Sequence, residues 1–122
     1  MAKRTILVVD DEAEFVDFIT ERLEAKKFRV LRAFNGKDGL EKARSDKPDL
    51  MVLDVTMPGI SGFDVCIKLK TDEGLKDMPI IMVTAKFQPN DVEFGKEVGA
   101  DAYITKPVEL DLLLKEINGL LK

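Results

Sequence analysis

Residues 49–64 read DLMVLDVTMPGISGFD, and this stretch contains one of each kind of element from which the fold is built. Leu50–Leu53 is a short apolar run, as expected of a strand that helices cover on both faces of a sheet. Met57-Pro58-Gly59 indicates a loop. Ser61 is suited to cap a helix over Gly62–Lys70, because its hydroxyl can accept a hydrogen bond from a backbone N–H of the first turn. The stretch therefore predicts a strand, a loop and a helix in succession.

The same succession of apolar run and helical stretch repeats along the chain. The other apolar runs are Thr5–Val9, Phe28–Ala33, Ile80–Val83 and Ala102–Thr105. Alternating strands and helices are typical of α/β proteins with a parallel sheet. Thr5–Val9, Leu50–Leu53 and Ile80–Val83 are nearly all apolar, so we predict that they are the central strands. Asn35-Gly36 and Lys47-Pro48 indicate turns.

The first and last predicted helices have the clearest helical spacing. Phe15, Ile19 and Leu23 recur every four residues, which predicts one buried stripe along the first helix. Apolar residues of the last helix follow the same spacing at Leu110, Leu113, Leu114, Ile117, Leu120 and Leu121. Both segments are therefore predicted to pack against the sheet.

The fourth helix is predicted to be the weakest. Asn90 followed by Glu93 resembles a capping box, with Asn90 as the N-cap. Gly95 and Gly99 lower the helix propensity of this segment. Its apolar residues form a thin set, namely Val92, Phe94 and Val98. We therefore expect this helix to be held less firmly than the others.

The length of the chain suits a single domain. It has 122 residues and a mass of 13.7 kDa, and no linker or low-complexity segment interrupts it. Residues 1–122 are thus predicted to form one domain, without an appended output module in this chain. Hydrophobic residues make up 45% and charged residues 34%, against about 45–50% and about 25% in an average domain. This composition predicts a folded protein with a highly solvated surface.

The charge balance and the single cysteine restrict the partners and the compartment. The formal net charge of −4 disfavours direct binding of nucleic acid. Because the sequence has neither a signal-peptide pattern nor a run of 18 apolar residues, we expect no association with a membrane. Cys66 cannot form an internal disulfide, which favours a reducing cytoplasm, and we predict that it is a small core residue without a function.

The sequence contains no histidine. This absence excludes Ser-His-Asp and Cys-His catalysis, zinc sites with histidine ligands, and a role as a histidine phosphoryl donor. Any chemistry must come from carboxylates, hydroxyls and lysines.

Polar residues follow four of the predicted strands at the point where each strand ends. Asp10 and Asp11 follow the first strand, Asp54 the third, Thr84 the fourth and Lys106 the fifth. The carboxyl ends of parallel strands meet at one edge of an open sheet, where ligands bind. Any one of these residues alone could be a cap or a loop residue. Together they predict a functional site at this edge.

The charges of these residues indicate a divalent cation. Asp10, Asp11 and Asp54 carry three negative charges and Lys106 one positive charge, which leaves −2. Oxygen ligands without histidine or cysteine select a hard cation, and the spacing favours Mg²⁺ over a calcium loop. Without the metal, repulsion among the carboxylates is expected to raise at least one pKa. A carboxylate beside Mg²⁺, Lys106 and the Thr84 hydroxyl is suited to accept a phosphoryl group.

Four motifs resemble those of the receiver domain of two-component response regulators. They are VVDDE at 8–12, DLMVLDVTMPGISGFD at 49–64, PIIMVTA at 79–85 and GADAYITKP at 99–107. Their order and separation agree with that family over essentially the whole chain. The resemblance implies a flavodoxin-like (βα)5 fold, a doubly wound parallel sheet with strand order 2-1-3-4-5. It also implies that a sensor histidine kinase or histidine phosphotransfer protein phosphorylates Asp54.

The resemblance further implies how the metal and the phosphoryl group are held. Asp11, Asp54 and the backbone carbonyl of Thr56 correspond to direct Mg²⁺ ligands, and Asp10 acts through water. Lys106 corresponds to the partner of the phosphoryl group or of Asp54, and a cis peptide bond is expected before Pro107.

Other positions correspond to residues that respond to phosphorylation. Thr84 and Tyr103 match the switch pair, and the fourth helix, fifth strand and fifth helix form the face for a downstream protein or a second copy of the chain. Thr56 and Lys86 match positions that tune phosphoryl lifetime. The sequence departs from common family patterns at Ala102 and Val108, outside the predicted chemistry.

Two other classes of protein share parts of this pattern. An aspartate-nucleophile phosphatase also uses aspartate, Mg²⁺, lysine and threonine, but it needs an acid two residues after the nucleophile, where this chain has Thr56. A flavin-binding electron carrier shares the topology, but Asp10, Asp11 and Glu12 would repel the flavin phosphate.

Overall fold

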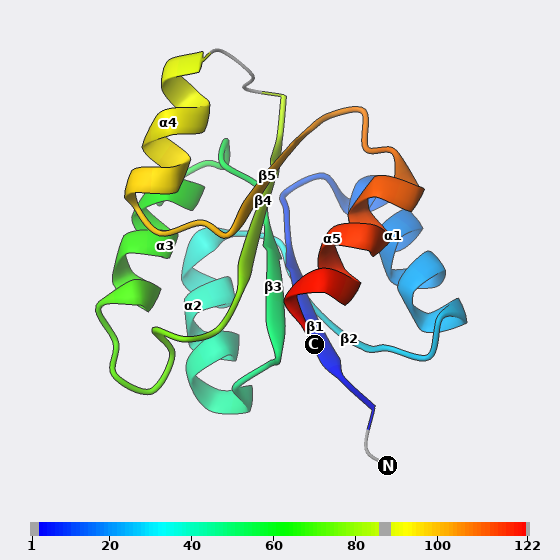
Figure 1. Cartoon of the computed structure of the whole chain (residues 1–122). Helices are drawn as coiled ribbons and strands as arrows, with labels where there is room; N and C mark the ends of the chain where they lie inside the picture. Colours follow the sequence, from blue (N-terminus) through cyan, green and yellow to red (C-terminus); the bar gives the residue numbers. More distant parts are fainter. Residues whose placement is uncertain (1–2, 86–88, 122) are drawn as a thin grey trace.

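The computed structural model describes residues 3–85 and 89–121, and within them five strands and five helices alternate (Figure 1). The first half comprises β1 (Thr5–Val9), α1 (Ala13–Ala25), β2 (Arg29–Ala33), α2 (Gly36–Asp46) and β3 (Leu50–Leu53). The second half comprises α3 (Gly62–Lys70), β4 (Ile80–Thr84), α4 (Pro89–Glu97), β5 (Ala102–Thr105) and α5 (Leu110–Leu120).

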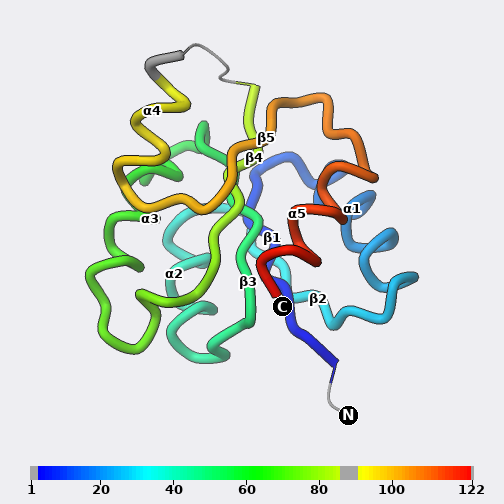
Figure 2. The backbone as a smooth tube through the Cα atoms, in the orientation of Figure 1, coloured from blue at the N-terminus to red at the C-terminus, as the bar shows by residue number. Residues whose placement is uncertain are grey.

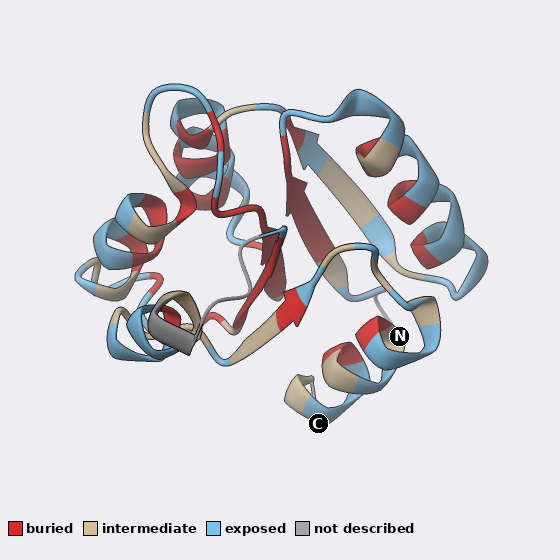
Figure 3. Cartoon of the chain, turned by 90° about the horizontal axis from the view of Figure 1, so that it is seen from above, coloured by how far each residue is buried: buried red, intermediate tan, exposed pale blue. Residues whose placement is uncertain are grey.

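The strands form one parallel sheet in the order β2-β1-β3-β4-β5. Helices α2, α3 and α4 cover one face, and α1 and α5 cover the other (Figures 1 and 2). This arrangement confirms the predicted (βα)5 fold and strand order. The central strands β1, β3 and β4 are also those predicted, and Figure 3 shows their burial between the helices. None of the described helices is long and apolar enough to cross a membrane.

Two strand boundaries differ from the prediction. β2 begins at Arg29, one residue after the predicted Phe28. β4 extends to Thr84, which pairs with Thr105 of β5, so Thr84 belongs to the strand instead of following it. Thr84 is consequently fully buried, like the rest of β4.

Side chains of each central strand alternate between two hydrophobic cores. In β1, Leu7 and Val9 face the core beneath α2 and α3, whereas Ile6 and Val8 face the core beneath α1 and α5. Ile19 and Leu23 are fully buried as predicted, but the third member of the buried stripe is Val16. Phe15, which was predicted in this stripe, is only partly buried.

The helix N-termini show one confirmed cap and two corrections. Ser61 caps α3 and accepts a hydrogen bond from the backbone N–H of Asp64 at 3.2 Å. Asn35-Gly36 is not a simple turn, because Asn35 caps α2 and accepts from the N–H of Asp38 at 2.8 Å. The predicted cap at Asn90 is wrong, since α4 already begins at Pro89.

A close backbone contact fixes α3 against the end of β3. A Cβ atom at Gly62 would lie 2.1 Å from the carbonyl oxygen of Asp54 and 2.7 Å from Cα of Val55. The N–H of Gly62 donates a hydrogen bond to the carbonyl oxygen of Val55 at 2.8 Å. The first residue of α3 therefore lies directly on the backbone that carries Asp54, and only glycine permits this approach.

Substitution of this glycine tests the contact. We expect Gly62→Ala to lower the free energy of unfolding by about 1–3 kcal/mol, because rigid backbone atoms must move to admit the methyl group. Urea titration followed by circular dichroism measures the change. Gly119→Ala is the matched control, since a Cβ there meets no atom within 4 Å and α5 gains helix propensity. An unchanged urea midpoint for Gly62→Ala would contradict the proposed constraint.

Candidate functional site

Three carboxylates meet at the carboxyl edge of the sheet. Val9 and Leu53 are paired in register, so Asp10 and Asp54 lie at neighbouring strand ends. The N–H of Asp54 donates to the carbonyl oxygen of Val9 at 2.9 Å. One carboxylate oxygen from each of Asp10, Asp11 and Asp54 lies within 4.8 Å of the others. The sequence prediction that these three residues converge is therefore confirmed.

The three carboxylates differ in exposure. The relative accessibility of Asp10 is 1% and that of Asp54 is 5%, whereas Asp11 is exposed. An N–H of the following loop, that of Glu12, donates to Oδ1 of Asp10 at 2.9 Å. The backbone N–H of Thr56 donates to the Asp54 carboxylate. The two buried carboxylates are thus oriented by backbone groups, and Asp11 faces solvent.

Lys106 extends over this cluster from the end of β5. The Lys106-Pro107 peptide bond is cis, as expected, and the N–H of Lys106 donates to the carbonyl oxygen of Thr84 at 2.8 Å. Nζ of Lys106 donates to Oδ2 of Asp10 at 2.8 Å and to Oε1 of Glu12. The resemblance implied a pairing with Asp54 or its phosphoryl group, whereas in this structure the ammonium group is bonded to Asp10 and Glu12.

Lys106 also contacts two residues that the sequence analysis did not connect with it, Phe15 of α1 and Glu12 of the preceding loop. Nζ lies 4.5 Å from the ring centroid of Phe15, a cation–π distance. Glu12 adds a fourth carboxylate, so the formal charge of the group is four negative and one positive, or −3, instead of the predicted −2. Helical spacing marked Phe15 only as a core residue, because its partner lies about 90 residues away in the sequence.

Burial and like charges raise the pKa values of the central carboxylates. Burial is the largest cause of the rise in the pKa of Asp54 to about 6, and the charge of Asp10 adds to it. Lys106 and the N–H of Thr56 oppose this rise. The pKa of Asp10 is also raised by burial, although the hydrogen bond from Lys106 lowers it in part. The predicted rise is confirmed, but desolvation contributes more than the repulsion on which the prediction rested.

The pKa of Lys106 is raised as well, which favours its charged form. Burial lowers it, but hydrogen bonds to Asp10 and Glu12 and the charge of Asp54 outweigh that effect and raise it overall. Lys106 therefore stays protonated throughout the neutral range and supplies a fixed positive charge.

The donor set fits a hard divalent cation. All three converging side chains offer carboxylate oxygens, and Asp11 is open to solvent for further water ligands. Burial is the largest cause of the raised pKa of Asp54, and the charge of Asp10 that adds to the rise is one that such a cation would offset. The Asp10, Asp11 and Asp54 cluster is therefore compatible with a Mg²⁺ site.

The remaining predicted site residues lie beside this cluster or outside the described residues. Thr84 is buried at the end of β4, and Tyr103 on β5 packs partly buried against the core beneath α2 and α3. Burial, and then the charges of Asp91 and Asp54, raise the pKa of Tyr103 to about 12. The Thr56 side chain is exposed. Lys86 lies outside the described residues.

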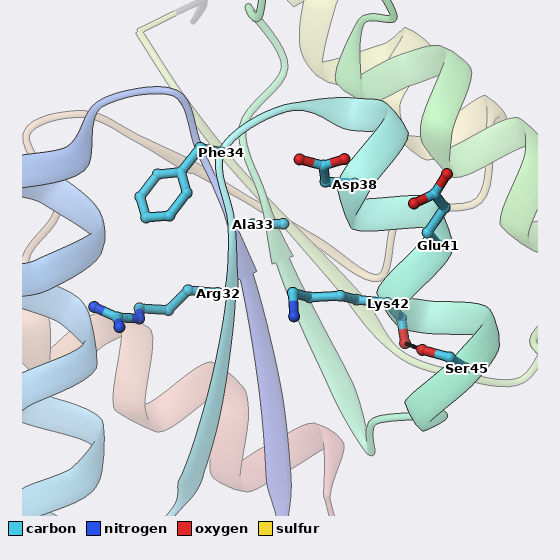
Figure 4. A pocket seen from close by; sticks show the side chains of 7 residues that line it. All are labelled: Arg32, Ala33, Phe34, Asp38, Glu41, Lys42 and Ser45. Carbon is cyan, nitrogen blue, oxygen red and sulfur yellow. Dashed lines mark hydrogen bonds between the residues drawn. The ribbon is translucent and has the colours of Figure 1, made fainter.

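A hollow of about 630 Å³ lies away from these carboxylates, between β2 and α2 (Figure 4). Its lining combines charges of both signs around Ala33 and Phe34. Arg32 points away from α2 and pairs with Asp17 of α1 at 3.2 Å. Because these charges do not converge on one point, the hollow lacks the chemistry of the carboxylate cluster, which is the candidate site.

Comparison with known proteins agrees with this site and fold. The family model of the response regulator receiver domain matches residues 6–118. PilH of Pseudomonas aeruginosa is 43% identical over 116 residues, which make up 95% of this chain and 96% of PilH. The phosphate regulon transcriptional regulatory protein PhoB of the same organism is 41% identical over 122 residues, which cover 100% of this chain and 53% of PhoB. The chain thus spans nearly all of PilH but about half of PhoB.

A solved structure gives the same result for the three-dimensional fold. The chemotaxis protein CheY4 of Vibrio cholerae has a TM-score of 0.93 and 30% sequence identity, covering 98% of this chain and 100% of that chain. The family match, the curated relatives and the strand order agree, and the chain therefore belongs to the response regulator receiver domain family.

Proposed function

We propose that residues 1–122 form one receiver domain that accepts a phosphoryl group on Asp54 from a sensor histidine kinase or histidine phosphotransfer protein, in a Mg²⁺-dependent reaction in the cytoplasm. One observation carries this proposal. Asp54 is a buried carboxylate with a raised pKa, and Asp10, Asp11 and Lys106 surround it at the carboxyl edge of the sheet. Receiver domains are signalling modules, so we set aside the phosphatase and flavin-carrier alternatives.

Asp54 is the group that forms the new bond. Its pKa of about 6 leaves most of the carboxylate ionised at pH 7, so no general base is required. A carboxylate oxygen attacks phosphorus, the bond between phosphorus and the donor nitrogen breaks, and the electron pair stays on that nitrogen. The product is an acyl phosphate on Asp54.

The neighbouring residues bind the incoming charge. Asp11, Asp54 and the Thr56 carbonyl would hold Mg²⁺ directly and Asp10 through water, and the bound ion would offset the repulsion between carboxylate and phosphate. Lys106 uses two N–H donors on Asp10 and Glu12, which leaves the third for a phosphoryl oxygen. We assign the Thr84 hydroxyl, at the end of the neighbouring strand β4, to bind another oxygen.

The switch follows from the position of Thr84 in the sheet. Movement of its hydroxyl toward the phosphoryl group frees space toward β5, and Tyr103 turns into that space. The face of α4, β5 and α5 then binds a downstream protein or a second copy of the chain. The position of β5 at the sheet edge supports this assignment, because its outer side is not covered by another described strand.

Labelling with a small phosphoryl donor tests the acceptor. With acetyl phosphate and Mg²⁺, the intact protein should gain one phosphoryl group, and Asp54→Asn should gain none, because its amide is not a nucleophile. Intact mass measurement distinguishes the two. Asp77→Asn, which changes an exposed aspartate, should label like wild type. Full labelling of Asp54→Asn at another residue would refute the assignment.

The raised pKa of Asp54 predicts how stability depends on pH. The folded state binds this proton at a pKa of about 6 and the unfolded chain at the ordinary value of 3.8, so ionisation lowers the free energy of unfolding as the pH rises between these values. Without Mg²⁺, Asp54→Asn should therefore be more stable than wild type at pH 7.5, by about 2 kcal/mol.

Thermal unfolding from pH 4 to pH 8 measures this difference, which should shrink toward pH 4.

Added Mg²⁺ should raise the Tm of wild type more than that of Asp54→Asn, because only the wild type has the acceptor charge to neutralise. Asp11→Ala should bind Mg²⁺ at least about tenfold more weakly, which is about 1.4 kcal/mol. A pH-independent difference between wild type and Asp54→Asn would contradict the charge argument.

The lifetime of the acyl phosphate depends on how water reaches phosphorus. We propose that Thr56 and Lys86 give a long lifetime, because neither residue provides a carboxylate or amide to orient an attacking water. Thr56→Asn combined with Lys86→Glu should speed dephosphorylation about tenfold, or about 1.4 kcal/mol of barrier. A phosphate-release assay measures the rate, with Lys76→Glu as the control for charge. Equal rates in the double variant and wild type would show that lifetime is set elsewhere.

A further inference from the structure

Gly95 lies in the interior of α4, where glycine is less favourable than alanine for helix stability. A packing contact accounts for it. A Cβ atom at Gly95 would lie 2.9 Å from Cδ2 and 3.1 Å from Cε2 of Tyr103. The missing side chain therefore provides the space that one edge of the tyrosine ring occupies.

The side chain of Met82, on the neighbouring strand, reaches the same position of α4. Tyr103 is paired in register with Met82 of β4, and the Sδ atom of Met82 lies 3.4 Å from the same Cβ position. Tyr103 also packs against the core beneath α2 and α3. Its ring thus lies between the sheet and the helix backbone at Gly95, which we call the Gly95 slot.

Contacts at both sides of the slot hold α4 in place. The rings of Phe94 and Phe63 meet edge to face, with centroids 4.8 Å apart. After the helix, Lys70 pairs with Asp101 at 3.6 Å, and a Cβ at Gly99 would lie 2.8 Å from Cγ of Lys70. These contacts join α4 and the chain just after it to α3, whereas the ring of Tyr103 can rotate about its own side-chain bonds, so we expect a side chain at residue 95 to displace the ring more readily than the helix.

We propose that Gly95 is a positioning residue of the switch, and that the absence of its side chain keeps the Tyr103 ring inside the slot in the unphosphorylated protein. This inference rests on the proposed switch and adds a second control over it. Thr84 links the ring to the phosphorylation site, whereas residue 95 sets how much of the ring population lies inward before phosphorylation. A methyl group at residue 95 shifts the ring outward and alters the α4, β5 and α5 face without a phosphoryl group.

The sequence makes the ring easy to observe. Tyr103 is the only tyrosine, and the chain has no tryptophan, so tyrosine fluorescence reports this side chain alone. Quenching by acrylamide is measured on the unphosphorylated protein without Mg²⁺. For Gly95→Ala the quenching constant should rise at least about twofold, because a larger fraction of the Tyr103 rings points outward, where acrylamide can reach them.

Gly119→Ala is the matched control. It also replaces a helical glycine, and a Cβ there meets no atom within 4 Å. Its quenching constant should equal that of wild type. Equal quenching of Gly95→Ala and wild type would overturn the proposal.

A double-mutant cycle separates the ring contact from general effects on α4. In a Tyr103→Ala background, Gly95→Ala should raise Tm as Gly119→Ala does, because only the gain in helix propensity remains. With Tyr103 present, the same substitution should raise Tm less or lower it. Additive effects in the two backgrounds would also overturn the proposal.

Beryllofluoride with Mg²⁺ distinguishes this inference from the proposed function. In wild type it should change the quenching of Tyr103, and in Gly95→Ala the change should be smaller because the methyl group hinders the inward turn of the ring. A wild type that does not respond, together with increased quenching in Gly95→Ala, would contradict the Thr84–Tyr103 switch and support the slot.

Discussion

The burial of two neighbouring carboxylates, Asp10 and Asp54, is the constraint on which the site depends. Parallel pairing of β1 and β3 places them at adjacent strand ends, and burial raises the pKa of both. Lys106 offsets this cost only partly, because the desolvation of the carboxylates outweighs its favourable charge. The folded chain therefore retains an excess of negative charge in a confined place. A divalent cation would relieve the same excess that opposes the approach of a phosphate, so one electrostatic cause connects metal binding with phosphoryl transfer in the proposed function.

Two glycines allow close packing near the site, but they pack against groups of different mobility. At Gly62 the obstacle to a side chain is backbone, since its Cβ would meet the Asp54 carbonyl oxygen at 2.1 Å. At Gly95 the obstacle is the ring of Tyr103, which can rotate. The first contact fixes Asp54 relative to α3, and the second leaves one movable group beside α4. A fixed carboxylate and a movable ring suit the proposed function, in which chemistry at one point changes a surface at another.

Much of this arrangement could be predicted from the sequence, because apolar runs and helical spacing report burial directly. The convergence of Asp10, Asp11 and Asp54 followed from strand ends in a parallel sheet, and the strand order followed from the resemblance to receiver domains. The contact of Phe15 with Lys106 could not be predicted, since it depends on how a helix near one end of the chain faces a loop near the other. Asn35 and Asn90 show that residue type alone does not predict where a helix begins. Each has the chemistry of a helix cap, but only at Asn35 does the chain begin a helix at the next residue.

Any path from Asp54 to the outer strand runs across the sheet. Asp54 follows a central strand, and β4 separates it from the edge strand β5. Side chains of β4 are buried on both faces, and close packing leaves them little freedom to move in response to a change at Asp54. Thr84 and Lys106 offer another route, because both lie at the carboxyl edge and are joined by a backbone hydrogen bond of 2.8 Å. Through this bond the end of β4 contacts the chain just after β5, the strand that carries Tyr103. In the proposed switch, this hydrogen bond links charge neutralisation at the carboxyl edge to β5 without a rearrangement of the central strands.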